Sequence, residues 1–350
     1  MSVGSALSHL LAYLLCASAL LHNADALAGC LDQKRLLGVN LSGAEFGHER
    51  LPGVLNKDYT YPSRKDLVYF RDMKMNAIRL PFRWERIQRK LGGPLDLTEL
   101  LELRRTVGWA KQLNLCVVLD LHNFGTYYGR ALGTPSLPAS AFVDVWLRLH
   151  QAFGNPDETA FGLMNEPAEM PVSQWMTIAQ QTVLALRGAG ARHLLLVGSG
   201  RWSGAHEFAK EFDGASGAAG FRTFKDPLNN FAIELHQYAD ADYSGTSNQC
   251  IAAARLKGIL DNVTAWAKQE KKRFFLGEFG VANSAECLVA LRALLHSTQN
   301  QDTWLGWAYW SAGPWWGDYP LSIQPNDANE PAQTRVLREF LSSQSPNTPQ

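Results

Sequence analysis

Short apolar runs of strand length recur along this chain at fairly even intervals, and segments with helical periodicity separate them. Strands that alternate with helices in one domain predict a parallel sheet, and eight of them close into a (β/α)8 TIM barrel, an α/β fold. The predicted strands are 36–40, 77–80, 115–121, 161–165, 193–197, 231–236, 274–279 and 305–310. The clearest predicted helices are 99–113, 141–153, 175–189, 251–270 and 285–295.

An open, doubly wound sheet is the alternative architecture. Its best support is Gly198-Ser199-Gly200, which follows the fifth predicted strand as a nucleotide-binding loop would. The third glycine of that motif should fall at position 203, which is Ser203, and no suitable acidic partner for a ribose follows. The glycines therefore do not indicate a dinucleotide site, and the barrel is favoured.

Length and charge limit the domain count and the kinds of partner. A chain of 350 residues suits one large α/β domain. Its 33 basic residues balance its 33 acidic ones, and a nucleic-acid-binding protein would need a basic surface. We therefore expect no nucleic-acid partner, and nothing in the sequence implies an obligate protein partner.

The ends of the chain have a different composition from the centre. Residues 1–29 contain an apolar stretch, 10–21, followed by small residues, which is typical of an export signal and too short to span a bilayer. Residues 342–350 are rich in Ser, Pro, Thr and Gln and are expected to be a disordered tail. The predicted division is a signal peptide at 1–29, one barrel domain at 30–341 and the tail. The protein is therefore expected to be secreted, or held in the periplasm or at the outer surface.

The cysteines leave two questions open. Leu27-Ala28-Gly29-Cys30 resembles a bacterial lipobox, in which Cys30 would become a lipid anchor; the alternative is ordinary signal cleavage with Cys30 incidental. Cys116 lies inside an apolar run, where a buried free thiol is expected. No Cys or His spacing typical of a structural zinc site occurs, so no metal is expected.

Polar and aromatic residues follow the predicted strands. The active sites of such barrels lie at the C-terminal ends of the strands, so these side chains should converge on one face. Isolated polar residues at strand ends often only cap the next loop, but a full set on one face indicates a site. The set is Asn40, Arg79, His122, Asn123, Asn165, Glu166, Ser199, Trp202, His236, Tyr238, Glu278 and Trp310.

Two of these positions carry the carboxylates that glycoside hydrolysis needs. Glu166 lies in Met164-Asn165-Glu166-Pro167, where the proline ends the strand, and Glu278 lies in Gly277-Glu278-Phe279-Gly280. The fourth and seventh strands face each other across a barrel mouth, so the two groups can flank a bond. A pair of acids also explains why no cofactor motif is found, and no cofactor is expected.

The chain resembles glycoside hydrolase family 5, and more narrowly its subfamily 5 endo-β-1,4-glucanases. The resemblance covers about residues 35–341, in family order. It rests on Gly38–Gly43, Ile78–Pro81, Asp120–Asn123, Met164–Pro167, His236–Tyr238, Gly277–Phe279 and Trp310–Pro314, with a narrower match at Tyr238–Cys250.

The resemblance implies a retaining mechanism with Glu166 as acid/base and Glu278 as nucleophile. Arg79 and Tyr238 would hold the nucleophile ionised, and Asn165 would bond the sugar 2-hydroxyl. The other expected substrate-binding or supporting residues are His122, Asn123, Trp202, His236, Trp310 and Trp315. The loop that carries Trp315 and Trp316 could turn either ring inward. Cys250 and Cys287 match cysteine positions in relatives, which implies a disulfide between them.

The substrate that the resemblance implies is a β-1,4-glucan such as cellulose. Two alternatives remain at this level. One is a β-mannanase or a mixed-linkage glucanase on the same barrel. The other is an inactive barrel that only binds carbohydrate, which loss of either carboxylate would have favoured.

Overall fold

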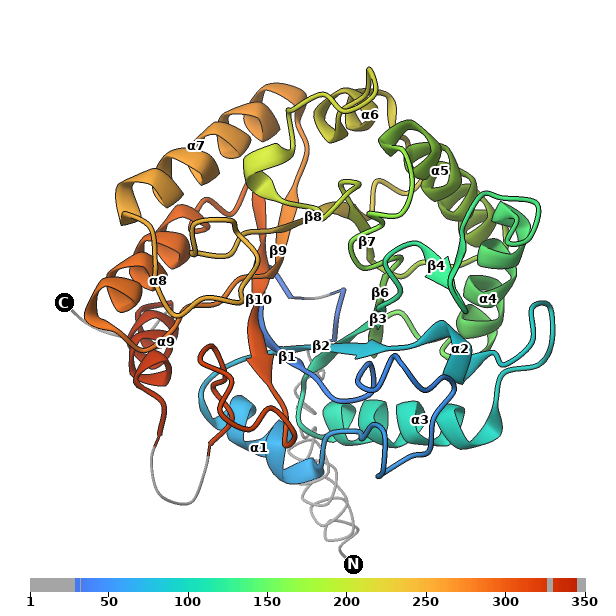
Figure 1. Cartoon of the computed structure of the whole chain (residues 1–350), viewed down its shortest axis with the longest axis horizontal. Coiled ribbons are helices and arrows are strands. Elements are labelled where there is room, and N and C mark those ends of the chain that lie inside the picture. The colour runs from blue at the N-terminus through green and yellow to red at the C-terminus, as the bar shows by residue number, and fades with distance from the viewer. Residues whose placement is uncertain (1–28, 32, 326–329, 345–350) are drawn as a thin grey trace, which may run out of the picture.

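Eight parallel strands form a closed barrel at the centre of the molecule, with helices around it (Figure 1). The computed structural model describes residues 29–31, 33–325 and 330–344. Neighbouring strands pair in the order β1-β10-β9-β8-β7-β6-β3-β2, so the TIM-barrel prediction is confirmed. The barrel strands are β1 (Leu36–Leu41), β2 (Ala77–Phe82), β3 (Cys116–Leu121), β6 (Thr159–Gly162), β7 (Leu195–Gly198), β8 (Phe231–His236), β9 (Phe274–Glu278) and β10 (Trp304–Ala312).

The strands match the predicted runs to within a few residues, and each predicted helix is present. A short hairpin, β4 (Thr126–Tyr127) with β5 (Arg130–Ala131), stands outside the barrel. The helices are α1 (Arg64–Asp72), α2 (Trp84–Ile87), α3 (Leu97–Gln112), α4 (Ala139–Ala152), α5 (Val172–Gly188), α6 (Gly217–Thr223), α7 (Ala253–Glu270), α8 (Ala285–Ser297) and α9 (Ala332–Ser343), with a 3-10 turn at Ala205–Glu207.

Two apolar layers hold the barrel together. The larger one lies between the strands and the helices. The smaller one draws side chains from all eight barrel strands, so it fills the barrel interior, and many of its members are small or β-branched as a narrow barrel requires. Its members are Cys30, Leu36, Ala77, Cys116, Val118, Ala160, Leu194, Leu196, Ala232, Phe275, Leu305 and Ala308.

Cys30 and Cys116 form a disulfide, which corrects two expectations. Their Cα atoms lie 4.8 Å apart, and both side chains belong to the buried interior cluster. Cys116 is therefore not a free thiol. A lipid anchor would attach to the Cys30 sulfur, and that sulfur is already bonded to Cys116, so the lipobox interpretation of Leu27–Cys30 conflicts with the structure.

The predicted end segments fall mostly outside the described residues. Of the predicted signal peptide only Gly29 is described, and residues 345–350 of the predicted tail are not. Helix α9 continues to Ser343, two residues beyond the predicted end of the domain. None of the helices in the described ranges has the length and apolar character needed to cross a bilayer.

Candidate active site

The upper part of the barrel interior is polar, and Arg79 lies at its centre. Alternate residues of a strand face the same side, so Arg79 on β2 points inward like Ala77 two residues earlier. Its side chain is fully buried. Arg79 Nη1 donates to Asn40 Oδ1 at 2.8 Å and to Glu278 Oε1 at 2.9 Å, and Nη2 donates to Asn165 Oδ1 at 2.8 Å. One guanidinium therefore connects β2 with residues from three other strands or strand ends.

Two further carboxylates lie close to Arg79. Asp120 Oδ1 lies 3.1 Å from Nη2, and Glu234 Oε1 lies 2.9 Å from Nε. Burial by itself would lower the pKa of Arg79, but Asp120, Glu234 and Glu278 outweigh burial and raise this pKa. The arginine therefore stays charged beside Glu278.

Glu278 reaches the interior because of an irregularity at the end of β9. Phe275 faces inward and Leu276 outward, so simple alternation would turn Glu278 outward. The pairing of β8 with β9 shifts after Leu235, and Glu278 comes to lie opposite His236. Such a bulge re-aims the following side chain, and it brings the Glu278 carboxylate back over the barrel.

Both oxygens of Glu278 accept hydrogen bonds. Arg79 donates to Oε1, and the Tyr238 hydroxyl donates to Oε2 at 2.6 Å. Burial and the nearby charge of Glu278 raise the pKa of Tyr238, so the phenol keeps the proton that it donates. Both donors favour an ionised Glu278.

Glu166 lies on the other side of the opening, in a loop that follows β6. Its backbone φ of +40° lies in the left-handed region, which is uncommon for a residue with a side chain and often occurs at functional sites. His236 Nδ1 is 2.7 Å from Glu166 Oε1. Burial raises the pKa of Glu166 to about 7; the charge of Glu278 adds to this rise and His236 opposes it.

The two glutamates are close enough to act on one bond. Glu166 and Glu278 each place a carboxylate oxygen within 4.8 Å of the other, with His236 Nδ1 3.7 Å from Glu278 Oε2. Retaining glycosidases hold their carboxyl groups about 5–5.5 Å apart, whereas inverting enzymes need about 6.5–9.5 Å to admit water. The separation is on the retaining side of this division.

Glu166, His236 and Glu278 also have the spacing of a metal-ligand set, and within the described ranges no other group of three such residues does. Arg79 and Tyr238 already donate to Glu278, and His236 is itself cationic. Burial would lower the pKa of His236, but Glu278 and Glu166 raise it to about 10. A protonated imidazole repels a metal ion, so the cluster suits proton transfer better than metal binding.

A cleft of about 480 Å³ opens above these carboxylates. Aromatic rings cover much of its wall, and flat apolar faces with polar rims suit sugar rings. Trp310 stacks on His122 with ring centroids 5.5 Å apart, and Trp202 at the rim is 49% exposed. The cleft is lined by His122, Phe124, Glu166, Trp202, His206, Tyr238, Asp242, Tyr243, Ser244, Gly245, Thr246, Glu278, Trp310, Trp316 and Tyr319.

His122 and Asn165 are fixed by the layer below. His122 Nδ1 lies 2.8 Å from Asp120 Oδ2, and Asn165 Nδ2 lies 3.2 Å from His122 Nε2. Burial lowers the pKa of His122, so its ring is neutral, with Nδ1 donating to Asp120 and Nε2 accepting from Asn165. This chain of contacts aligns the Asn165 amide with Arg79 on its other side.

Two of the predicted substrate-binding or supporting residues, Asn123 and Trp315, do not line the cleft. Asn123 is fully buried; its Oδ1 accepts from the backbone N–H of Trp84, and its Nδ2 donates to Glu85 and to the carbonyl of Thr126. It therefore shapes the loop after β3 and does not face the cleft. Trp315 is 41% exposed and does not line the cleft either, whereas the adjacent Trp316 does.

Several residues of the site were missed from sequence. Asp120 and Glu234 were not among the predicted site residues, although each stands two residues before a predicted histidine and so faces the same side of its strand. A charged residue inside a buried parallel strand was the available signal. His206 and Tyr243, whose rings stack with centroids 4.1 Å apart in the cleft wall, lie in loops and carried no such signal.

Known proteins resemble this chain over most of its length. The family described as Cellulase (glycosyl hydrolase family 5) matches residues 39–313. The chain is 32% identical over 309 residues to "Probable endo-beta-1,4-glucanase B" of Aspergillus oryzae, covering 87% of this chain and 90% of that protein.

Solved structures are also similar. The endo-beta-1,4-glucanase Xac0029 from Xanthomonas axonopodis pv. citri aligns with a TM-score of 0.86 and 42% identity, over 88% of this chain and 99% of that one. The structure of XacCel5A in complex with cellopentaose aligns with a TM-score of 0.85 and 43% identity, over 88% and 100% of the two chains. Because the family model spans residues 39–313 and a relative 32% identical covers 87% of the chain, this chain belongs to glycosyl hydrolase family 5.

Proposed function

We propose that this protein is an endo-β-1,4-glucanase that hydrolyses internal bonds of cellulose and related β-glucans with retention of configuration. The observation that carries the proposal is the placement of Glu166 and Glu278, whose carboxylate oxygens approach within 4.8 Å below an aromatic cleft. Two carboxyl groups at this separation suit double displacement.

In the first step Glu278 acts as the nucleophile. An oxygen of Glu278 attacks the anomeric carbon while the bond from that carbon to the glycosidic oxygen breaks, and Glu166 gives its proton to the departing oxygen. Glu166 Oε1 faces His236, and Oε2 has no hydrogen-bond partner among the described side chains, so Oε2 is free to carry that proton. A glycosyl ester on Glu278 results.

In the second step Glu166 acts as a base. Once Glu278 is esterified it no longer raises the pKa of Glu166, so Glu166 stays ionised and takes a proton from water. That water attacks the anomeric carbon, the ester bond breaks, and Glu278 leaves as a carboxylate. Glu166 is then protonated again, ready for the next bond.

The assignment of roles rests on the unequal surroundings of the two glutamates. Glu278 accepts from Arg79 and Tyr238, which suits a residue that must be ionised at the start. Burial raises the pKa of Glu166 to about 7, which suits a residue that must be protonated at the start.

The substrate class is inferred from the cleft and from relatives. Trp202, Trp310 and Trp316 line the cleft, and flat apolar rings suit sugar rings. Asn165, the proposed partner of the sugar 2-hydroxyl, is buried beside Arg79 and directly precedes Glu166 in the sequence. Two of the relatives described above are named as endo-β-1,4-glucanases, and a third, XacCel5A, was solved with cellopentaose. A β-1,4-linked glucan is the substrate that fits both observations.

Product analysis on defined cello-oligosaccharides tests the function. We expect cleavage of internal β-1,4 bonds and initial release of the β-anomer. NMR identifies the anomer that is released first. Assays of the same preparation on carboxymethylcellulose, lichenan and mannan separate the alternatives. A preference for mannan or for lichenan would replace the proposed specificity. If none of the three is cleaved, the protein is a barrel that only binds sugar.

We further propose that the protein is exported and that residues 1–29 are removed. Two disulfides, Cys30–Cys116 and Cys250–Cys287, support an oxidising compartment. Intact mass of the protein recovered from the medium checks this proposal. The mass expected is that of a chain beginning near Cys30 with four half-cystines and no lipid; full-length protein retained in the cell would contradict it.

A further inference from the structure

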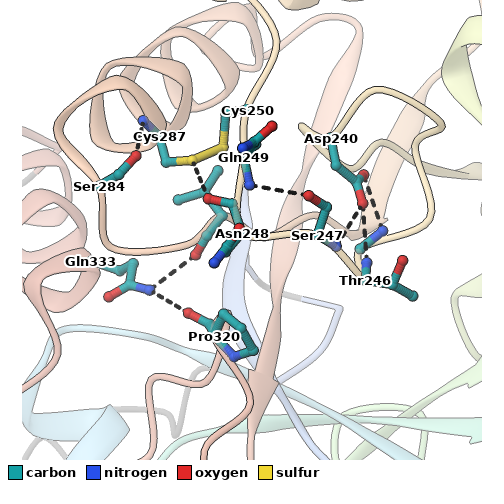
Figure 2. Close-up of a disulfide and its surroundings, with 12 residues drawn as sticks. Asp240, Thr246, Ser247, Asn248, Gln249, Cys250, Ser284, Cys287, Pro320 and Gln333 are labelled. Atoms are coloured by element: carbon teal, nitrogen blue, oxygen red, sulfur yellow. Dashed lines mark hydrogen bonds between the residues drawn. A yellow bond between two sulfur atoms is a disulfide. The ribbon is translucent and has the colours of Figure 1, made fainter.

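The loop after β8, residues 240–250, is closed at its neck and forms one wall of the cleft. Ile251 N donates to the carbonyl of Ala239 at 2.8 Å, which joins the two ends of the loop. The Cys250–Cys287 disulfide, with Cα atoms 5.2 Å apart, ties the same end to helix α8 (Figure 2). Residues 242–246 line the cleft. A loop with joined ends and internal contacts behaves as one compact unit.

The carboxylate of Asp240 organises this loop from inside. It is only 2% exposed, and Figure 2 shows it facing Thr246 and Ser247. Asp240 Oδ1 accepts from Gly245 N at 3.1 Å, and Oδ2 accepts from Thr246 N at 3.0 Å and Ser247 N at 3.1 Å. The hydroxyl of Ser244 donates to Oδ2 as well, at 3.1 Å.

The charge of Asp240 is balanced by the loop itself. No Lys, Arg or His among the described residues forms an ion pair with Asp240, so the three backbone N–H groups and one hydroxyl are its partners. Hydrogen bonds from backbone N–H groups to an ionised acceptor are roughly twice as strong as neutral ones. Losing the negative charge would therefore loosen the backbone at residues 245–247.

Gly245 connects this loop to Tyr238. Its φ of +72° lies in the left-handed region, and a Cβ at Gly245 would stand 2.7 Å from Cδ1 and Cε1 of the Tyr238 ring. The Gly245 backbone therefore lies directly on that ring. The Gly245 N–H donates to Asp240, and the Tyr319 hydroxyl donates to the Gly245 carbonyl at 2.9 Å.

Tyr238 carries the effect to the reacting group. The Gly245 backbone packs against its ring, and its hydroxyl donates to Glu278 Oε2 at 2.6 Å. A shift of the ring by a few tenths of an ångström would change this bond, because hydrogen-bond strength falls steeply with distance and angle. Asp240 makes no contact with Glu278 itself.

We infer that Asp240 is a positioning residue for catalysis, which acts on the nucleophile Glu278 through Gly245 and the Tyr238 ring. This inference rests on the proposed glucanase function. It differs from a role in loop stability alone, because it requires that the effect of Asp240 on turnover disappear when the Tyr238 hydroxyl is removed.

The test is a double-mutant cycle between D240N and Y238F. An asparagine at position 240 keeps the shape of the side chain, but its NH2 group is itself a donor and would face backbone N–H donors. We expect D240N to lower kcat about tenfold in the wild-type background and by less than about twofold in Y238F, a coupling of the size found for contacting residues. Rates on a dinitrophenyl cellobioside are divided by the concentration of active sites, titrated with its 2-deoxy-2-fluoro analogue.

A matched control is D226N. Asp226 is also a buried carboxylate that accepts from two backbone N–H groups, those of Leu228 and Asn230, and it pairs with Arg187 away from the cleft. D226N is expected to lower Tm and to leave kcat per active site within about twofold of the wild type, which separates loss of stability from loss of positioning.

The outcomes are distinct. Equal losses of kcat from D240N in the two backgrounds, or a change in KM alone, would overturn the inference and leave Asp240 as a loop-stabilising residue. Should D240N not fold, Y319F frees Gly245 from its other side and enters the same cycle, where equal losses again overturn it. An inactive wild type would overturn the proposed function, and the inference with it.

Discussion

Nδ1 of His236 lies 2.7 Å from Oε1 of Glu166. The same nitrogen is 3.7 Å from Oε2 of Glu278, so one imidazole contacts both carboxylates. Nearby carboxylates raise the pKa of His236 to about 10 despite its burial, and its positive charge lowers the electrostatic cost of two carboxyl groups held this close. This relationship makes the pH response of the site predictable.

Activity should decline as the pH rises through about 7. Burial and the charge of Glu278 raise the pKa of Glu166 to about 7, and the proposed mechanism needs Glu166 protonated in its first step, so the free enzyme should lose its acid above that pH. The measurement is kcat/KM for a cello-oligosaccharide from pH 4 to 10. A basic limb that begins only above about pH 9 would show that Glu166 is not the acid.

Azide should rescue one glutamate variant with retention and the other with inversion. In E166A the glycosyl-enzyme still forms from a substrate with a good leaving group, and azide then attacks it without needing a base, giving a β-glycosyl azide after two inversions. In E278A azide attacks the substrate directly and gives the α-azide. NMR of the products decides the assignment, and the opposite pattern would reverse the two roles.

Removing Arg79 should destabilise the protein strongly. R79M leaves Asp120, Glu234 and Glu278 buried without their shared cation, and breaking a buried ion pair from one side typically costs about 3–5 kcal/mol. The measurement is the free energy of unfolding in urea. R292A is the matched control, because Arg292 pairs with Glu339 on the surface, where such a pair contributes about 0–1 kcal/mol. Similar losses from both variants would contradict this account of the barrel interior.

The neighbouring tryptophans 315 and 316 should differ in function. Trp316 lines the cleft and packs edge-on against Trp310, with ring centroids 5.9 Å apart, whereas Trp315 is not among the residues that line it. W316A is expected to lower kcat/KM on cello-oligosaccharides about tenfold, equivalent to ~1.4 kcal/mol of lost binding to the transition state, and W315A less than about twofold. If W315A has the larger effect, the placement of these two rings is wrong.

Local sequence patterns predicted the fold because they reflect local physics. Apolar runs of strand length and helical periodicity depend on the covalent geometry of adjacent residues, so the barrel could be read from the order of these segments. Glu166 and Glu278 were identified because their motifs end strands in a barrel that gathers its chemistry at one face. Family resemblance then supplied a role for each of them.

Contacts between side chains from distant parts of the sequence could not be predicted in this way. Alternation alone would have turned Glu278 away from the barrel, and only the shifted pairing of β8 and β9 brings it opposite His236. Cys116 read as an isolated thiol because its partner, Cys30, is 86 residues away in the sequence. Trp315 and Trp316 are adjacent, and no local pattern tells which ring turns inward.

The sequence by itself thus determined the alternation of strands and helices, and with it which residues stand at the catalytic end of the barrel. The tertiary structure alone decided which of them touch. Arg79 and Glu278, for example, are 199 residues apart and form a hydrogen bond of 2.9 Å. The physical reason is that secondary structure depends on neighbours along the chain, whereas the pKa of Glu166 and the hydrogen bonds of Glu278 depend on charges and donors brought in from distant strands.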